Sequence, residues 1–233
     1  MFKMRLVLSI VGYINLILFC YIFWNNAPQR LYGAPLAGIV VDAGTGKPIP
    51  GAYVSYLWED ATDPKGFFGS GGRTICFHAA GTVTDEAGRF HVDAWSAWST
   101  YRVANKDPQA LIYVPGYVPT TVFLHEGHVE PPVPRLHERY ALQRSAGTHE
   151  QRIEALFWGF ANRGCSYGGE SQKRLYPMLR AIYLEARDLA QSAHQKETVD
   201  VIGELAARSA VAPNPDGPAD SERLQAFVQE NLK

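Results

Sequence analysis

Histidine and carboxylate side chains, the donors that zinc enzymes use, gather in the stretch from His125 to Glu130. His125, His128 and Glu130 together would supply nitrogen and oxygen ligands for a catalytic metal ion. A zinc site also needs ligands that converge with defined geometry, whereas this stretch is a polar connection followed by Pro131 and Pro132. Imidazoles in such a connection are simply solvated, so we expect no metal and no cofactor. A metal-dependent hydrolase built on these three residues is the enzymatic alternative.

Three other motifs match the spacing of chemical signatures but lack the context that those signatures need. Gly164–Gly168 reads Gly-x-Ser-x-Gly, yet the nucleophile elbow follows a strand, and a helical pattern precedes it here. Gly44–Lys47 lacks the first glycine of a phosphate-binding loop and is followed by Pro48 instead of Ser or Thr. His194 and Glu197 have the spacing of the zinc carboxypeptidase pair, but no histidine follows as a third ligand. We therefore expect no catalytic residues and no enzyme activity.

Alternating apolar residues and turn residues predict β-structure in the first half of the chain. Ile39 and Val41 share one face of an extended segment that ends at Asp42, as in a half-buried strand. The Asp42 side chain can accept hydrogen bonds from backbone amides ahead of it, which favours a tight turn over residues 43–47. A second turn over residues 85–88, closed by a glycine, predicts a hairpin.

The order and spacing of these turn and strand residues resemble the carboxypeptidase regulatory-like domain family. The matching positions are Gly38, Val40, Asp42, Thr45, Gly46, Pro48, Ile49, Gly51, Ala52, Val54, Thr84, Asp85, Gly88, Phe90 and Val114 to Tyr117. The resemblance implies a transthyretin-like, seven-stranded β-sandwich over residues 36–144, and a non-catalytic role, because such domains are appendages of other proteins. The chain departs from the family in a long Gly-rich insertion, residues 59–74, and in carrying no peptidase domain.

Beyond Ser145 the apolar residues recur with a helical period, starting from a capping box formed by Thr148 and Gln151. The expected fold class is mainly β with an α-helical C-terminal extension of three or four helices packed on the sandwich. The expected domains are a membrane anchor (1–24), a linker (25–35), the sandwich (36–144), the helical extension (145–212), and a linker with a short terminal helix (213–233).

The N-terminal segment, residues 1–24, has the pattern of a membrane anchor. Lys3 and Arg5 precede the apolar run from Leu6 to Trp24, which as a helix would span ~28 Å, close to the hydrocarbon thickness. The positive flank places the N-terminus in the cytoplasm. We therefore expect a single-pass protein of the inner (cytoplasmic) membrane whose C-terminal part is periplasmic or otherwise extracytoplasmic. A cleaved signal peptide and a lipoprotein signal ending at Cys20 are the alternatives.

The Gly-rich insertion is the candidate recognition loop. Phe67 and Phe68 stand among glycines, and two phenylalanines are costly to expose unless they meet a partner or fold back on the sandwich. Both outcomes stay open at the level of sequence.

Two of the three cysteines, Cys76 and Cys165, lie beyond the anchor. Because two leftover cysteines in an oxidising compartment usually pair, we expect a disulfide that fastens the helical extension to the sheet. Two buried free thiols are the alternative.

Composition excludes one class of partner, since a net charge of −1 gives no electrostatic basis for binding nucleic acid. The sequence thus favours a non-catalytic, membrane-anchored, extracytoplasmic β-sandwich module for protein or glycan binding or envelope assembly. An inert structural spacer in an envelope complex is the alternative without a partner-binding role.

Overall fold

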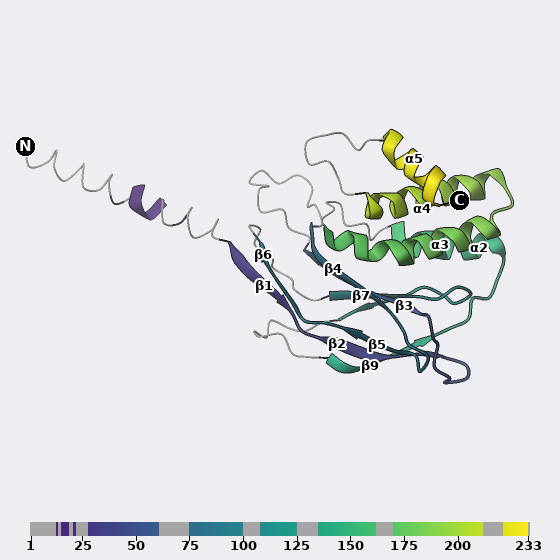
Figure 1. Cartoon of the computed structure of the whole chain (residues 1–233), viewed down its shortest axis with the longest axis horizontal. Helices are drawn as coiled ribbons and strands as arrows, with labels where there is room; N and C mark the ends of the chain where they lie inside the picture. The colour runs from purple at the N-terminus through teal and green to yellow at the C-terminus, as the bar shows by residue number, and fades with distance from the viewer. Residues whose placement is uncertain are drawn as a thin grey trace, which may run out of the picture.

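A computed structural model of the chain describes residues 28–60, 75–99, 108–124, 135–161, 170–211 and 221–232, with residues 13, 15–18 and 21 near the N-terminus. The described part consists of two β-sheets, a separate two-stranded ribbon and a layer of helices (Figure 1). The strands are β1 (Gln29–Gly33), β2 (Leu36–Asp42), β3 (Tyr53–Asp60), β4 (Ile75–Val83), β5 (Arg89–Val92), β6 (Trp95–Ser99), β7 (Pro108–Tyr113), β8 (Thr120–Phe123) and β9 (Arg135–Leu142).

The two sheets have the strand orders β5-β2-β9 and β4-β3-β7-β8. All neighbours are antiparallel except β2 and β9, which run parallel. The inner faces enclose one apolar core, whose largest members include Tyr56, Trp58 and Phe90. Across this core the hydroxyl groups of Tyr56 and Tyr140 lie 3.1 Å apart and share a hydrogen bond. Each buried phenol thereby has the partner that burial demands.

The four-stranded sheet is buried on both faces. The helices α2 (His149–Ala161), α3 (Tyr176–Leu189), α4 (Ala193–Ala210) and α5 (Ser221–Asn231), with the short 3-10 helix η1 (Glu170–Leu175), lie over its outer face (Figure 1). Leu111 and Tyr113 of β7 point into this second core with Ile153, Ile182 and Ile202 of the helices. Alternate residues of one strand therefore join two different cores, which explains why all residues of β7 except Gln109 are buried.

Small residues let the helical layer approach the sheet. A Cβ atom on Gly81 of β4 would lie 2.7 Å from the backbone oxygen of Arg174 in η1. The neighbouring Ser55 hydroxyl donates to the sulfur of Met178, at 3.4 Å. Between helices, a Cβ on Gly203 would lie 2.8 Å from the Tyr183 ring. Since real Cβ atoms do not make such short contacts, larger residues at the two glycines would push the layers apart.

The coarser form of the expected fold, β-sheets followed by several helices, is confirmed. Within the segment expected as a linker, residues 25–35, Gln29–Gly33 forms β1. This strand pairs antiparallel with β6, and Leu31 becomes buried as a result. Within the described part of the chain, no helix is both long and apolar enough to cross a membrane.

Candidate functional site

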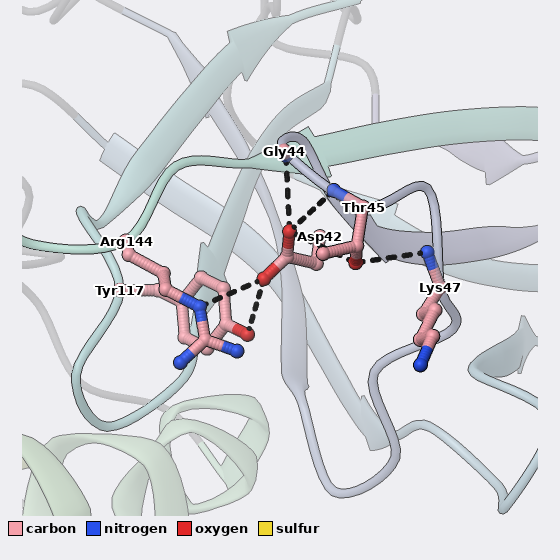
Figure 2. Close-up of polar contacts among 6 residues, drawn as sticks. All are labelled: Asp42, Gly44, Thr45, Lys47, Tyr117 and Arg144. Carbon is pink, nitrogen blue, oxygen red and sulfur yellow. Dashed lines mark hydrogen bonds and ion pairs between the residues drawn. The ribbon is translucent and has the colours of Figure 1, made fainter.

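One end of the sandwich is held by the carboxylate of Asp42, at the end of β2 (Figure 2). One oxygen accepts hydrogen bonds from the backbone of Gly44 at 3.0 Å and from the backbone and hydroxyl of Thr45 at 2.9 and 3.1 Å. The other oxygen accepts from the Tyr117 hydroxyl at 2.9 Å and from Arg144 Nε at 3.0 Å. The carboxylate thus fixes its own turn and two segments that are distant in sequence.

These bonds give the Asp42 carboxylate a structural role. The hydrogen bonds from the Tyr117 hydroxyl and the Thr45 backbone hold the pKa of Asp42 well below its usual range. The same bond raises the pKa of Tyr117. Such a carboxyl stays ionised at neutral pH and has its acceptor positions occupied, so it is poorly suited to receive a proton as a general base.

A second carboxylate, that of Glu185 in α3, joins the helices to the same end of the sheet. It forms a two-point ion pair with Arg152 of α2, with Nε to Oε1 at 2.8 Å and Nη2 to Oε2 at 2.9 Å. The hydroxyl of Tyr113 donates to it at 2.6 Å and the backbone of Gly116 at 3.2 Å. Burial, together with the bond to Glu185, raises the pKa of Tyr113.

Tyr117 links the two networks. Its hydroxyl donates to Asp42, and its backbone oxygen accepts a short hydrogen bond from Nη1 of Arg152. The guanidinium of Arg144 lies 5.3 Å from the centre of the Tyr117 ring. We call residues Asp42, Tyr117, Arg144, Arg152 and Glu185 the polar end.

Aromatic rings occupy the opposite end. In the register of β3, Tyr53 pairs with Tyr113 next to the polar end, and Trp58 pairs with Pro108 at the far end. There the imidazole of His78 stacks on Trp95, with centroids 4.0 Å apart, and both meet Trp58 edge-on at 5.2 and 5.1 Å. Burial, with a smaller effect of Arg174, lowers the pKa of His78 to about 4. A histidine held neutral in this way packs as an aromatic ring.

The ribbon of β1 and β6 extends from this end (Figure 1), and two of its aromatic residues face solvent. Trp98 is 72% exposed and Tyr32 is 45% exposed. Arg30 pairs directly with Trp98 in the register, places its guanidinium 5.2 Å from the centre of the Tyr32 ring, and donates to the Ser96 hydroxyl at 3.2 Å. Directly opposed residues share one face of a ribbon, so these side chains form one surface, which we call the ribbon face.

The sequence-predicted site residues fall largely outside the described part of the chain. Phe67, Phe68, His125, His128, Glu130 and Cys165 lie outside it, as does most of the anchor segment 1–24. Cys76 lies in β4, and its side chain is not described. The recognition loop, the metal alternative and the disulfide therefore stay predictions. Among the described residues, no cluster of three or more His, Cys, Asp or Glu side chains could hold a metal ion.

Sequence reasoning missed the ribbon face. The signal that could have found it is the spacing Trp95-x-x-Trp98 beside the alternation Arg30-Leu31-Tyr32. Two short alternating segments can form a ribbon with one buried and one open face.

No protein-family model matches the sequence, and no curated protein matches it. Solved structures with some similarity include 3-chlorocatechol 1,2-dioxygenase from Rhodococcus opacus, at 17% identity and a TM-score of 0.30, with 50% of this chain and 61% of that chain covered. Another is the C-terminal domain of the shaft pilin spaA from Lactobacillus rhamnosus GG, at 13% identity and a TM-score of 0.28, with 50% and 99% covered. This chain therefore spans less than two thirds of the dioxygenase. At such TM-scores these likenesses carry no argument about function.

Proposed function

We propose that this chain is a non-catalytic module of the cell envelope, anchored in the inner membrane by residues 1–24, with its folded part on the extracytoplasmic side. It binds a protein or glycan, or takes part in envelope assembly, through the aromatic end. The finer fold assignment, a transthyretin-like sandwich of the carboxypeptidase regulatory-like type, belongs to the same proposal. A three-stranded and a four-stranded sheet around one core support that part of it.

The observation that supports the proposal is the position of the two described flanks of the predicted recognition loop. Of the insertion expected over residues 59–74, the first two residues complete β3. Asp60 and Ile75, the described residues on either side of residues 61–74, pair with each other at the far end of β3 and β4, just beyond Trp58 and His78. The described ends of the predicted recognition loop therefore lie at the aromatic end. Aromatic side chains are enriched where proteins make contacts, and the predicted loop carries Phe67 and Phe68.

The two ends of the sandwich have different roles in this proposal, and that of the polar end is structural. Its carboxylates are occupied by bonds that fasten turns and helices, which makes the module rigid where the layers meet. A rigid scaffold that carries its recognition residues on connections at one end is a common arrangement in binding domains.

A photo-crosslinking amino acid placed at Phe68 in the full chain, in intact cells, tests the proposal. We expect a discrete adduct whose sensitivity to protease or to glycosidase identifies the partner as protein or glycan. Placed at Trp158, which is 61% exposed on α2, the same crosslinker is the matched control and should give no such adduct. Identical adduct patterns at both positions would contradict the proposal. Stoichiometric zinc in the purified chain, lost in His128→Ala, would favour the hydrolase alternative instead.

A further inference from the structure

The ribbon face lies very close in sequence to the predicted membrane anchor. The apolar run ends at Trp24 and β1 begins at Gln29, five residues later. A fully extended chain advances at most about 3.3–3.6 Å per residue, so β1 begins within roughly 18 Å of the end of the apolar run. An anchor that spans the bilayer therefore holds the start of the ribbon near the headgroup layer.

The chemistry of the ribbon face matches that layer. Trp98 and Tyr32 each have an apolar ring and a polar tip, and such side chains concentrate at membrane–water interfaces. Arg30 neighbours both rings and brings a positive charge that anionic headgroups attract. The opposite face of the ribbon packs against the rest of the fold, because Leu31 is 1% exposed and Trp95 packs against the inter-sheet core.

We propose that the ribbon face rests on the lipid headgroup layer of the membrane that holds the anchor, with Trp98 and Tyr32 in the interface and Arg30 toward anionic headgroups. This inference rests on the membrane anchoring proposed above. A lipid surface fits better than a protein partner at this face. A protein interface usually buries about 800 Å² on each side, which is far more than two rings and one guanidinium provide.

The contact fixes the orientation of the whole module. Among the described strands, those of the ribbon pair only with each other, so a single tether at residue 24 would leave the module free to tilt. A second contact through the ribbon face turns the aromatic end toward the bilayer. The flanks of the predicted recognition loop lie at this end, so its partner is bound close to the membrane surface.

Fluorescence quenching of the full chain in vesicles tests the contact. The chain is reconstituted in vesicles of zwitterionic and anionic lipids, with and without lipids brominated near the headgroup. The quenched part of the tryptophan emission should fall in Trp98→Phe by roughly the share of one interfacial tryptophan. It should stay unchanged in the control Trp158→Phe, which removes an exposed tryptophan of α2. Because Trp98 is largely exposed, both variants should keep the circular dichroism spectrum of the parent chain.

Two results would overturn the inference, and they are distinguishable. Equal quenching in the parent chain and in Trp98→Phe, with the chain retained in the membrane after alkaline extraction, would overturn the ribbon contact alone. Release of the chain by alkaline extraction would overturn the anchoring and the contact together. Loss of part of the Trp98 quenching in Arg30→Gln, or in vesicles without anionic lipid, would support the role given to Arg30.

Discussion

The side chains of the aromatic end are more available to a ligand than those of the polar end. Residue type alone would suggest the opposite. The polar end holds the acids and arginines from which catalytic sites are usually built, yet Asp42 and Glu185 are each occupied by bonds from several elements. The aromatic end holds rings of the kind that fill protein cores, yet Trp98 is mostly exposed. Occupancy and exposure, rather than residue type, therefore decide which end is available for binding.

Removal of the guanidinium of Arg152 should strongly destabilise the fold. The side chain is 7% exposed, and that of its partner Glu185 is 15% exposed. In Arg152→Met the carboxylate keeps its bonds from Tyr113 and Gly116 but loses its counter-charge in a poorly hydrated place. Breaking a buried pair in this way costs about 3 kcal/mol, equivalent to a loss of about 6–12 °C in Tm for a domain of this size.

The matched control is Arg208→Met. Arg208 pairs with Glu204 one turn away on the surface of α4, with side chains 55% and 48% exposed. Such pairs contribute only about 0.3–0.5 kcal/mol, so the Tm should shift by less than about 2 °C. Equal shifts in the two variants would mean that the polar end is no more than a set of surface ion pairs. Both are measured by circular dichroism of the full chain in detergent.

The unequal success of prediction at the two ends has a physical cause. The Asp42 turn is predictable because its amide donors follow within three residues. The partners Tyr117 and Arg144 lie 75 and 102 residues away, and nothing local specifies them. The ribbon likewise joins segments some 66 residues apart, and neither five-residue strand is long enough to stand out as a strand by its own pattern.

The packing of the helices on the four-stranded sheet shows the same limit of prediction: the elements can be predicted, but not which of them pack together. The apolar run of β7 predicts a strand, and the helical stripes predict amphipathic helices, so both partners are visible in the sequence. That the helices cover β3, β4 and β7 rather than the other sheet depends on the close approach at Gly81 and Ser55. A glycine in a strand can equally mark a bulge or a sharp bend, so Gly81 does not by itself predict that a helical layer lies over β4.

Acid should weaken the aromatic end through His78. An unfolded chain binds the proton at its ordinary pKa of 6.5, whereas the folded chain binds it only near a pKa of about 4. Between these values the unfolded state holds more protons, so stability is highest above pH 6.5 and falls as the pH drops toward 4. Because the ring is partly exposed, the effect of this shift is smaller than for a fully buried histidine. Protonation of His78 should lower the free energy of unfolding by on the order of 2 kcal/mol.

The variant His78→Phe, which keeps a ring against Trp95, tests this pH dependence. The decline of Tm between neutral pH and pH 4 should be smaller than in the parent chain by a few degrees, as followed by circular dichroism at a series of pH values. An unchanged decline would show that His78 does not need to shed its charge in the folded state.

Replacement of Trp98 should change stability least, and this outcome separates the two roles found at the aromatic end. Trp58 is 1% exposed and belongs to the inter-sheet core, whereas Trp98 is 72% exposed on the ribbon face. In Trp98→Thr the new residue keeps a high strand propensity, so the loss in the free energy of unfolding should stay within about 0.5 kcal/mol, as for other surface positions. Trp58→Thr, the matched variant on β3, should cost about 3–5 kcal/mol because it opens a cavity in the core.

Thermal unfolding of both variants in detergent, without lipid vesicles, makes the measurement independent of any contact that Trp98 makes with a membrane. A loss of more than about 1 kcal/mol in Trp98→Thr would mean that this ring stabilises the ribbon itself, and an interfacial role would then no longer be needed to explain its exposure.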